Sequence, residues 1–250
     1  MEHSYAGETP GGLKTPMKRG LPQQVSQEIG IRILTGQYAP GDTLGDEPSL
    51  AQEFGVSRTV IREAVRVLIS KGMLDVRPRI GMRVQEPRKW QILDHEVLEW
   101  KQAVPLADQH LSQLIELRLG IEPLAARLAA SRRTQEDMSA IRKALQAMQD
   151  GAGRNSDYVM ADAGFHAAVL RAAHNRYFDA LENAIYAGLL LSIRITNPGK
   201  QQNLTSLPFH QSIADAIEAG EPETAQKEME RHLADSAARL ELALSAIQSS

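Results

Sequence analysis

Cysteine is absent from the 250-residue chain, and aromatic residues make up only 4% of it. Without thiolates, a transition-metal site would have to be built from His, Asp or Glu. No segment approaches about eighteen consecutive apolar residues, and the N-terminus lacks an apolar signal core, so we expect neither a membrane span nor secretion. These absences favour a cytoplasmic protein that folds around an ordinary hydrophobic core.

The overall charge of −3 hides an asymmetry along the chain. Residues 1–90 carry 13 Lys and Arg against 10 Asp and Glu, whereas residues 91–250 carry 15 against 21. Most of the basic excess falls between residues 57 and 90. A basic segment attached to an acidic body indicates a polyanionic partner for the first part only.

The segment from Gly55 to Leu68 predicts a helix that is apolar on one face and basic on another. Ser57 is a suitable N-cap, and Gly55 suits the tight turn before it. The basic face repeats every four residues, with Arg58, Arg62 and Arg66. Such a helix can enter the major groove of DNA, where Arg bridges guanine or contacts phosphate. Taken alone, the same pattern also fits a solvated amphipathic helix.

The flanking segments favour the DNA-binding interpretation. Residues 1–19 have no hydrophobic period and predict a disordered tail. Helices are expected over 21–34 and 48–54, and residues 73–84 alternate around a Pro/Gly turn as a two-stranded hairpin. Together these elements predict a winged helix-turn-helix domain over 20–87. Its wing carries the basic residues Arg77, Arg79 and Arg83.

Several motifs in this domain resemble the DNA-binding domain of the GntR family of bacterial transcription regulators. They are Glu47–Ala51, Gly55–Arg58, Ile61–Ala64 and Gly81–Val84. The resemblance implies that Arg58, Thr59 and Arg62 contact DNA, and that Gly81 lies at the tip of the wing. The sequence departs from the family at Pro48, where many relatives carry a DNA-contacting Arg. The DNA contact that this Arg would make is therefore absent or supplied by another residue.

The remainder of the chain predicts a linker helix over 88–108 and an all-α domain over 109–247. Every long segment of this domain has helical period, and no alternating strand pattern occurs. Helices are expected over residues 109–131, 134–149, 156–174, 176–196, 207–219 and 222–247. The fold class is therefore mainly α, with an N-terminal winged helix and a C-terminal helical bundle.

Four residues of the bundle form a candidate metal site. Asp162 and His166 are four apart on one helical face. His210 and His232 each lie eleven residues from Glu221, in a helix-helix turn, so an antiparallel hairpin places them at one level. One Asp and three His suit Zn, Ni, Mn or Co, with positions left for water or an anion. Each histidine taken alone is better explained as a packed or exposed side chain than as a metal ligand.

The same four residues resemble the metal-binding C-terminal effector domain (FCD) of the FadR-type branch of the family. That resemblance implies a divalent metal, with Zn expected and Ni or Mn as alternatives, and a carboxylate effector held by Arg118. The competing interpretation is a structural ion pair of Arg118 with Glu122 or Asp162. Arg194 is a second candidate contact for the effector.

We therefore expect a ligand-responsive transcription repressor that binds a pseudo-palindromic operator as a homodimer. Residues Asp94–Trp100 resemble the sugar-acid-responsive members, so an aldonate or hexuronate is the expected effector. One alternative is a metal-dependent hydrolase or isomerase, because an Asp/His3 site can activate water. Another is a constitutive DNA-binding protein whose bundle only dimerises.

Overall fold

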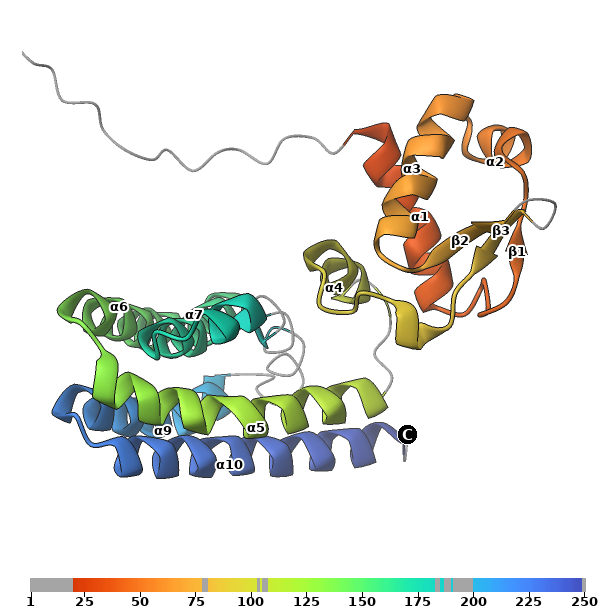
Figure 1. Cartoon of the computed structure of the whole chain (residues 1–250). Coiled ribbons are helices and arrows are strands. Elements are labelled where there is room, and N and C mark those ends of the chain that lie inside the picture. Colours follow the sequence, from red (N-terminus) through yellow and green to blue (C-terminus); the bar gives the residue numbers. More distant parts are fainter. Residues whose placement is uncertain are drawn as a thin grey trace, which may run out of the picture. The chain divides into compact units, whose positions relative to one another are not determined.

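The computed structural model describes residues 20–77, 81–102, 104, 108–182, 185, 186, 190 and 200–248. The chain divides into two compact units, and the division falls between Trp90 and Gln91 (Figure 1). Within the described ranges, no helix has both the length and the apolar character that crossing a membrane requires.

The first unit combines helices with a small antiparallel sheet. Its elements are α1 (Leu21–Leu34), β1 (Thr43–Leu44), α2 (Glu47–Phe54), α3 (Arg58–Ser70), β2 (Leu74–Arg77), β3 (Gly81–Val84) and the 3-10 turn η1 (Pro87–Lys89). Ile29 and Ile33 of α1 pack in the core with Ile61 and Leu68 of α3, and all four are almost fully buried. This arrangement is a winged helix-turn-helix, as predicted.

The sheet has three strands, whereas the sequence predicted only two. The hairpin pairs Leu74 with Val84 and Arg77 with Gly81. The additional strand β1 pairs with the other edge of β3, where Thr43 lies opposite Arg83. A two-residue strand is too short to show an alternating pattern, because only the long-range pairing with β3 defines it.

Two glycines determine how the ends of α3 connect to the rest of the unit. Gly55 has a φ of +64° and ends α2 in a left-handed turn, which L residues with a side chain disfavour. Gly72 has a φ of +69°, and a Cβ atom there would lie 2.1 Å from the carbonyl oxygen of Lys89. The segment that leaves the wing therefore passes directly over the end of α3.

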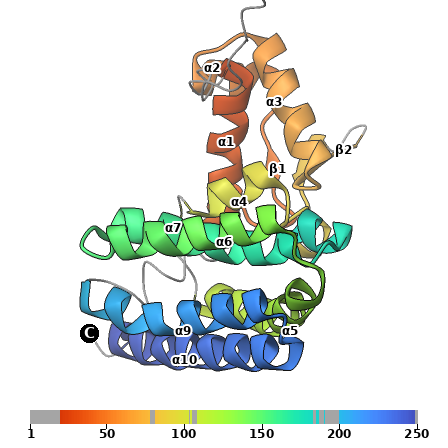
Figure 2. The same cartoon turned by 90° about the vertical axis from the view of Figure 1, so that its left-hand side faces the viewer.

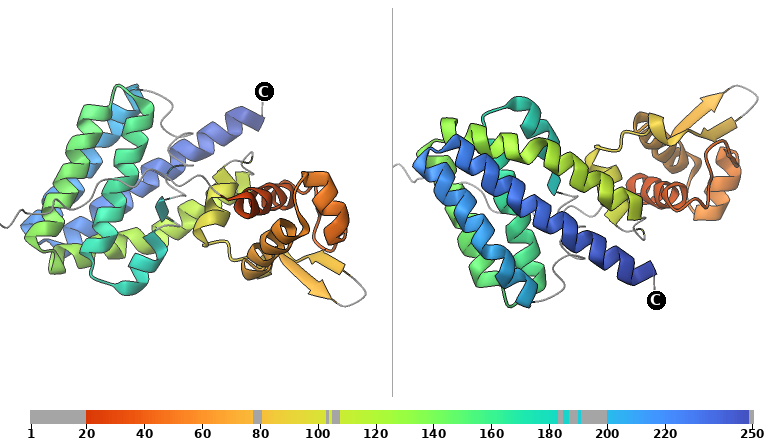
Figure 3. Two further views of the ribbon diagram at one scale, coloured as in Figure 1. Left: turned by 90° about the horizontal axis from the view of Figure 1, so that it is seen from above. Right: turned by 90° about the horizontal axis from the view of Figure 1, so that it is seen from below.

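The second unit is entirely helical in its described part. Its elements are α4 (His95–Gln102), α5 (Asp108–Arg132), α6 (Gln135–Gly151), α7 (Asn155–Ala172), α9 (Lys200–Ala219) and α10 (Pro222–Gln248). Helices α6 and α7 form one layer, and α5, α9 and α10 form the other (Figure 2). Figure 3 shows the α6 and α7 pair crossing over α10.

Aromatic and aliphatic side chains fill the space between these layers. Ile141 and Met148 of α6, Tyr158 and Phe165 of α7 and Leu233 of α10 are fully buried. The mainly α fold class that the sequence predicts is confirmed.

The linker helix and helix α9 differ from their predicted bounds, and about half of one predicted helix lies outside the described residues. In the described part of residues 88–108, the predicted linker helix is replaced by the 3-10 turn η1 and the shorter helix α4, which begins only at His95. Helix α9 begins at Lys200 rather than at 207, so Pro208 lies inside the helix. Proline is preferred in the first turn of a helix, so a proline in the interior of α9 is the exception to that preference. Residues 183, 184, 187–189 and 191–196 of the helix expected over 176–196 are outside the described ranges.

Candidate functional site

Helix α3 presents a polar face whose residues match the predicted DNA contacts. Ser57 caps the helix by accepting a hydrogen bond from the Val60 amide at 3.3 Å, as predicted. The apolar side of the helix is buried, and it comprises Ile61, Ala64, Val65 and Leu68. The predicted DNA-reading residues are all exposed, namely Arg58, Thr59, Arg62 and Arg66. The basic face of α3 is therefore accessible from solvent, as contact with a groove of DNA requires.

Two of these arginines are already held by carboxylates. Arg62 Nε and Nη2 donate to Glu47 Oε1 and Oε2 of α2, at 3.2 and 2.9 Å. Arg66 Nη1 donates to Glu63 Oε1 at 2.6 Å within α3 itself. Gly81 begins β3 with a φ of +88°, and the predicted wing residue Arg79 lies outside the described residues.

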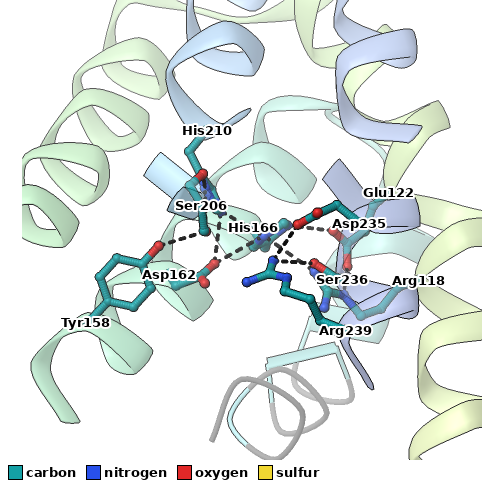
Figure 4. A network of polar contacts seen from close by, with 10 residues as sticks. All are labelled: Arg118, Glu122, Tyr158, Asp162, His166, Ser206, His210, Asp235, Ser236 and Arg239. Atoms are coloured by element: carbon teal, nitrogen blue, oxygen red, sulfur yellow. Dashed lines mark hydrogen bonds and ion pairs between the residues drawn. The ribbon is translucent and has the colours of Figure 1, made fainter. Parts of the chain in front are cut away.

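The four predicted metal ligands lie together in the interior of the helical unit. Asp162 and His166 come from successive turns of α7, His210 from α9 and His232 from α10 (Figure 4 shows three of them). Asp162 Oδ1 lies 3.2 Å from His166 Nε2 and 3.1 Å from His210 Nε2. The three imidazoles each offer a nitrogen, and these nitrogens lie within 4.8 Å of one another.

Groups behind these ligands orient two of the imidazoles. His210 Nδ1 donates to the Ser206 carbonyl oxygen at 3.0 Å, so Nε2 is the nitrogen that faces Asp162 and is available to a metal. Glu122 Oε2 of α5 lies 2.6 Å from His166 Nδ1. Outer partners of this kind hold metal-binding histidines in position and raise their basicity.

The cluster fits a divalent metal better than it fits a purely structural core. His232 Nδ1 is buried and has no hydrogen-bond partner within the described part of the chain. Burial lowers the pKa of His232 well below its usual range, and the neighbouring His210 and His166 lower it further. Burial alone would raise the pKa of Asp162, but His210 and His166 outweigh that effect and hold it well below 3.8. A neutral imidazole and an ionised carboxylate are the forms that bind metal.

Arg118 lies beside this cluster, although it is only 3% exposed. Its Nε donates to Glu122 Oε1 at 2.6 Å, and its Nη2 lies 3.4 Å from His166 Nε2. Burial would raise the pKa of Glu122, but Arg118 and His166 together lower it from 4.5 to about 2. Arg118 therefore forms the structural ion pair with Glu122 and also lies next to the predicted ligands, so the two interpretations do not exclude each other.

Three further residues near the cluster were not identified from the sequence. The hydroxyl groups of Tyr158 and Ser206 form a hydrogen bond at 2.8 Å. Tyr158 lies one helical turn before Asp162, and Ser206 lies one turn before His210. Arg239 of α10 pairs with Asp235 at 2.9 Å in the same network (Figure 4). Its position seven residues after His232, on the same helical face, was the signal that could have found it. Arg194, the second predicted effector contact, lies outside the described residues.

A winged helix with an exposed basic recognition helix, joined in one chain to a separate helical unit, defines a two-domain DNA-binding regulator. Residues 21–84 match the family described as bacterial regulatory proteins, gntR family, and residues 113–235 match the FCD domain. The chain is 32% identical over 206 residues to the uncharacterized HTH-type transcriptional regulator YieP of Escherichia coli (strain K12), covering 80% of this chain and 86% of the relative.

A second relative is the galactonate operon transcriptional repressor of the same strain, 32% identical over 213 residues, which are 85% of this chain and 93% of that protein. The solved structure of Lar, which controls expression of the Listeria monocytogenes agr system, has the same fold with a TM-score of 0.63. It is 19% identical and covers 90% of this chain and 98% of its own. The chain belongs to the GntR family and carries an FCD domain; it is a transcription regulator and not an enzyme.

Proposed function

We propose that the protein is a cytoplasmic repressor that binds a pseudo-palindromic operator as a homodimer and is controlled by a small carboxylic acid. In this proposal Arg58, Thr59, Arg62 and Arg66 read or clamp the operator, with Arg79 and Gly81 contributing from the wing. Two-fold symmetry doubles the few contacts that one recognition helix makes. The domain limits are those expected from the sequence: 20–87 for DNA binding, 88–108 for the linker and 109–247 for sensing and dimerisation.

In the sensory domain, Asp162, His166, His210 and His232 would hold a divalent metal, with Zn expected and Ni or Mn as alternatives. When bound, the metal supplies positive charge and open coordination positions for an oxygen of the effector. The observation that carries the proposal is the buried Arg118 guanidinium beside His166, with its Nη2 atom 3.4 Å from the imidazole. A buried guanidinium can receive a carboxylate in bidentate geometry while Glu122 balances its charge.

A sugar acid of the aldonate or hexuronate type is the proposed effector. The name of one relative, the galactonate operon repressor, supports this class. Polyhydroxylated acids also match a site that offers both charged and hydroxyl groups, here Arg118, Arg239, Ser206 and Tyr158. Binding at this site would lower operator affinity through a coupling free energy of about 1–3 kcal/mol, equivalent to roughly 5- to 150-fold. Arg194 remains a candidate second contact.

Operator binding measured with and without sugar acids tests this function. In zinc-loaded protein, we expect at least one aldonate or hexuronate to raise the melting temperature and to weaken operator binding measured by fluorescence anisotropy. Arg118→Lys keeps a positive charge beside Glu122 but loses the bidentate geometry, so it should lose the response to the acid. Without acid, its operator affinity should be unchanged.

Arg127→Lys is the matched control, because Arg127 lies on the same helix and pairs with Glu223 at 2.9 Å near the surface. This variant should respond to the acid as the wild type does. If none of the tested sugar acids changes the operator affinity of the wild-type protein, control by a carboxylate effector is refuted.

A further inference from the structure

Glu47 is the first residue of α2, yet its side chain contacts the recognition helix rather than its own helix. Both carboxylate oxygens accept from the Arg62 guanidinium, at 3.2 Å from Nε and 2.9 Å from Nη2. The pair remains accessible to solvent, because the Glu47 side chain is partly exposed, at 36%, and the Arg62 side chain is largely exposed, at 57%. An exposed pair adds little to folding stability, so this contact has no obvious role in holding the unit together.

The location of Glu47 makes its negative charge costly for DNA binding. With Asp46, it lines a groove of about 490 Å³ between the start of α2, Val65 of α3 and the wing residues Val76 and Met82. Two carboxylates on this side of a DNA-binding unit repel phosphates and weaken binding to any DNA sequence. A gain in affinity for certain DNA sequences would offset that cost.

The geometry of the pair indicates what this benefit is. Glu47 occupies the side edge of the guanidinium, which is formed by Nε and Nη2. The opposite end, with Nη1 and the second hydrogen of Nη2, remains open, and Nη1 has no partner among the described residues. Two donors at that end are sufficient to bridge O6 and N7 of guanine. A long side chain that is ordered before binding loses less entropy when it makes the contact.

We propose that Glu47 is a positioning residue for sequence recognition: it fixes the Arg62 guanidinium so that its free end meets a base, in place of the contact that Pro48 lacks. This inference rests on the proposed role of Arg62 as an operator contact. The pair raises the pKa of Arg62 and lowers that of Glu47, each chiefly through their shared hydrogen bonds. Both groups are therefore charged at neutral pH.

The test compares sequence specificity in full-length variants. An operator is first selected by the wild-type protein from a random-sequence duplex library. Dissociation constants for this operator and for an unrelated duplex are then measured by fluorescence anisotropy at one salt concentration. The specificity ratio is the dissociation constant for the unrelated duplex divided by that for the operator. This ratio separates base recognition from general attraction to phosphates.

Glu47→Ala should lower this ratio about tenfold, which corresponds to one impaired base contact. The ratio for Glu47→Gln should lie between those of Glu47→Ala and the wild type, because glutamine retains the shape of the side chain but not its charge. Glu63→Ala is the matched control: it removes the same charge but breaks a single hydrogen bond to Arg66, which does not fix the plane of that guanidinium as two bonds do, so it should change the ratio by less than about twofold. Melting temperatures close to that of the wild type show that every variant folds.

Arg62→Ala makes the test specific for the proposed partner. Once Arg62 is absent, Glu47→Ala should cause no further loss of specificity, because the residue that it positions is gone. An additive loss would overturn the positioning role. So would a Glu47→Ala variant that behaves like Glu63→Ala, or one whose affinity for the operator rises at least as much as its affinity for the unrelated duplex, because the carboxylate would then only mask Arg62. If Arg62→Ala itself leaves the ratio unchanged, the proposed role of Arg62 fails together with this inference.

Discussion

At the scale of single residues, the orientation of one imidazole shows how the helical unit prepares a metal site. The Ser206 carbonyl oxygen accepts from His210 Nδ1 at 3.0 Å, one turn earlier on the same helix. This contact keeps a proton on Nδ1 and directs Nε2 to within 3.1 Å of Asp162 Oδ1, where a metal could take the place of the Nε2 proton. The backbone of α9 thus selects the tautomer that can bind a cation.

Replacing His210 with alanine should therefore remove most of the bound metal. One of four ligands would be lost, which should weaken metal binding by more than the roughly 10- to 100-fold that loss of an outer partner of a ligand costs. Elemental analysis of the purified variant gives the metal content per chain. His174→Ala is the control, because His174 is half-exposed and contacts Asp137 rather than the cluster. Equal metal content in His210→Ala and wild-type protein would contradict the assigned site.

At the scale of elements, the start of α6 is held by interactions from two helices. Thr134 and Asp137 form a capping box, in which each side chain accepts from the other residue's backbone amide. His174, which follows α7, lies with its Nε2 atom 2.8 Å from Asp137 Oδ2. Asp137 therefore both caps α6 and joins it to the end of α7.

This arrangement predicts a specific dependence of stability on pH. Burial alone would raise the pKa of Asp137, but hydrogen bonds from Thr134 and His174 outweigh it and lower the pKa below 3.8. A carboxyl group with a lowered native pKa contributes stability that is complete above its unfolded pKa. That contribution disappears as the pH falls through the native pKa.

Asp137→Ala should lower the free energy of unfolding at pH 7 by about 1 kcal/mol, as is usual for a lost cap. It should also lose less stability than the wild type as the solution is acidified below about pH 5. Denaturant unfolding at a series of pH values measures both effects. Asp150→Ala, at the other end of α6, serves as the control. An acid dependence in Asp137→Ala as steep as that of the wild type would argue against the proposed role of the cap.

At the scale of the whole molecule, the two parts of the chain differ in charge. Residues 1–90 have an excess of three basic residues, and residues 91–250 have an excess of six acidic ones. The basic part contains α3 and the wing, and the acidic part contains the His cluster. DNA attraction is thus confined to the unit that would bind the operator, while the acidic unit avoids competing for phosphates.

Operator affinity should fall steeply as salt is added. Each neutralised phosphate contributes a slope of about −0.9 to the plot of log K against log salt concentration, so a dimer with six or more phosphate contacts would lose about a thousandfold between 50 and 200 mM. Anisotropy titrations across a salt series give this slope. Arg58→Ala should weaken binding and, if Arg58 contacts a phosphate, reduce the slope by about one contact. A flat salt dependence would contradict phosphate binding by α3 and the wing.

The sequence alone determined those features that depend on residues close together in the chain. The cap at Ser57, the four-residue repeat of Arg58 and Arg62, and the placement of Asp162 and His166 on one face all follow from helix geometry, because a helical turn involves only near neighbours. The resemblance of the motifs then identified the family, which the comparisons confirm. The metal and effector roles remain predictions.

Only the tertiary structure decided which groups from distant segments meet. The strand β1 exists through its pairing with β3, Glu122 of α5 reaches His166 of α7, and Glu47 of α2 holds Arg62 of α3. Such contacts depend on how helices pack against one another and on which rotamers that packing selects. Periodicity within one segment carries no information about either, so these partners became visible only when the chain was folded.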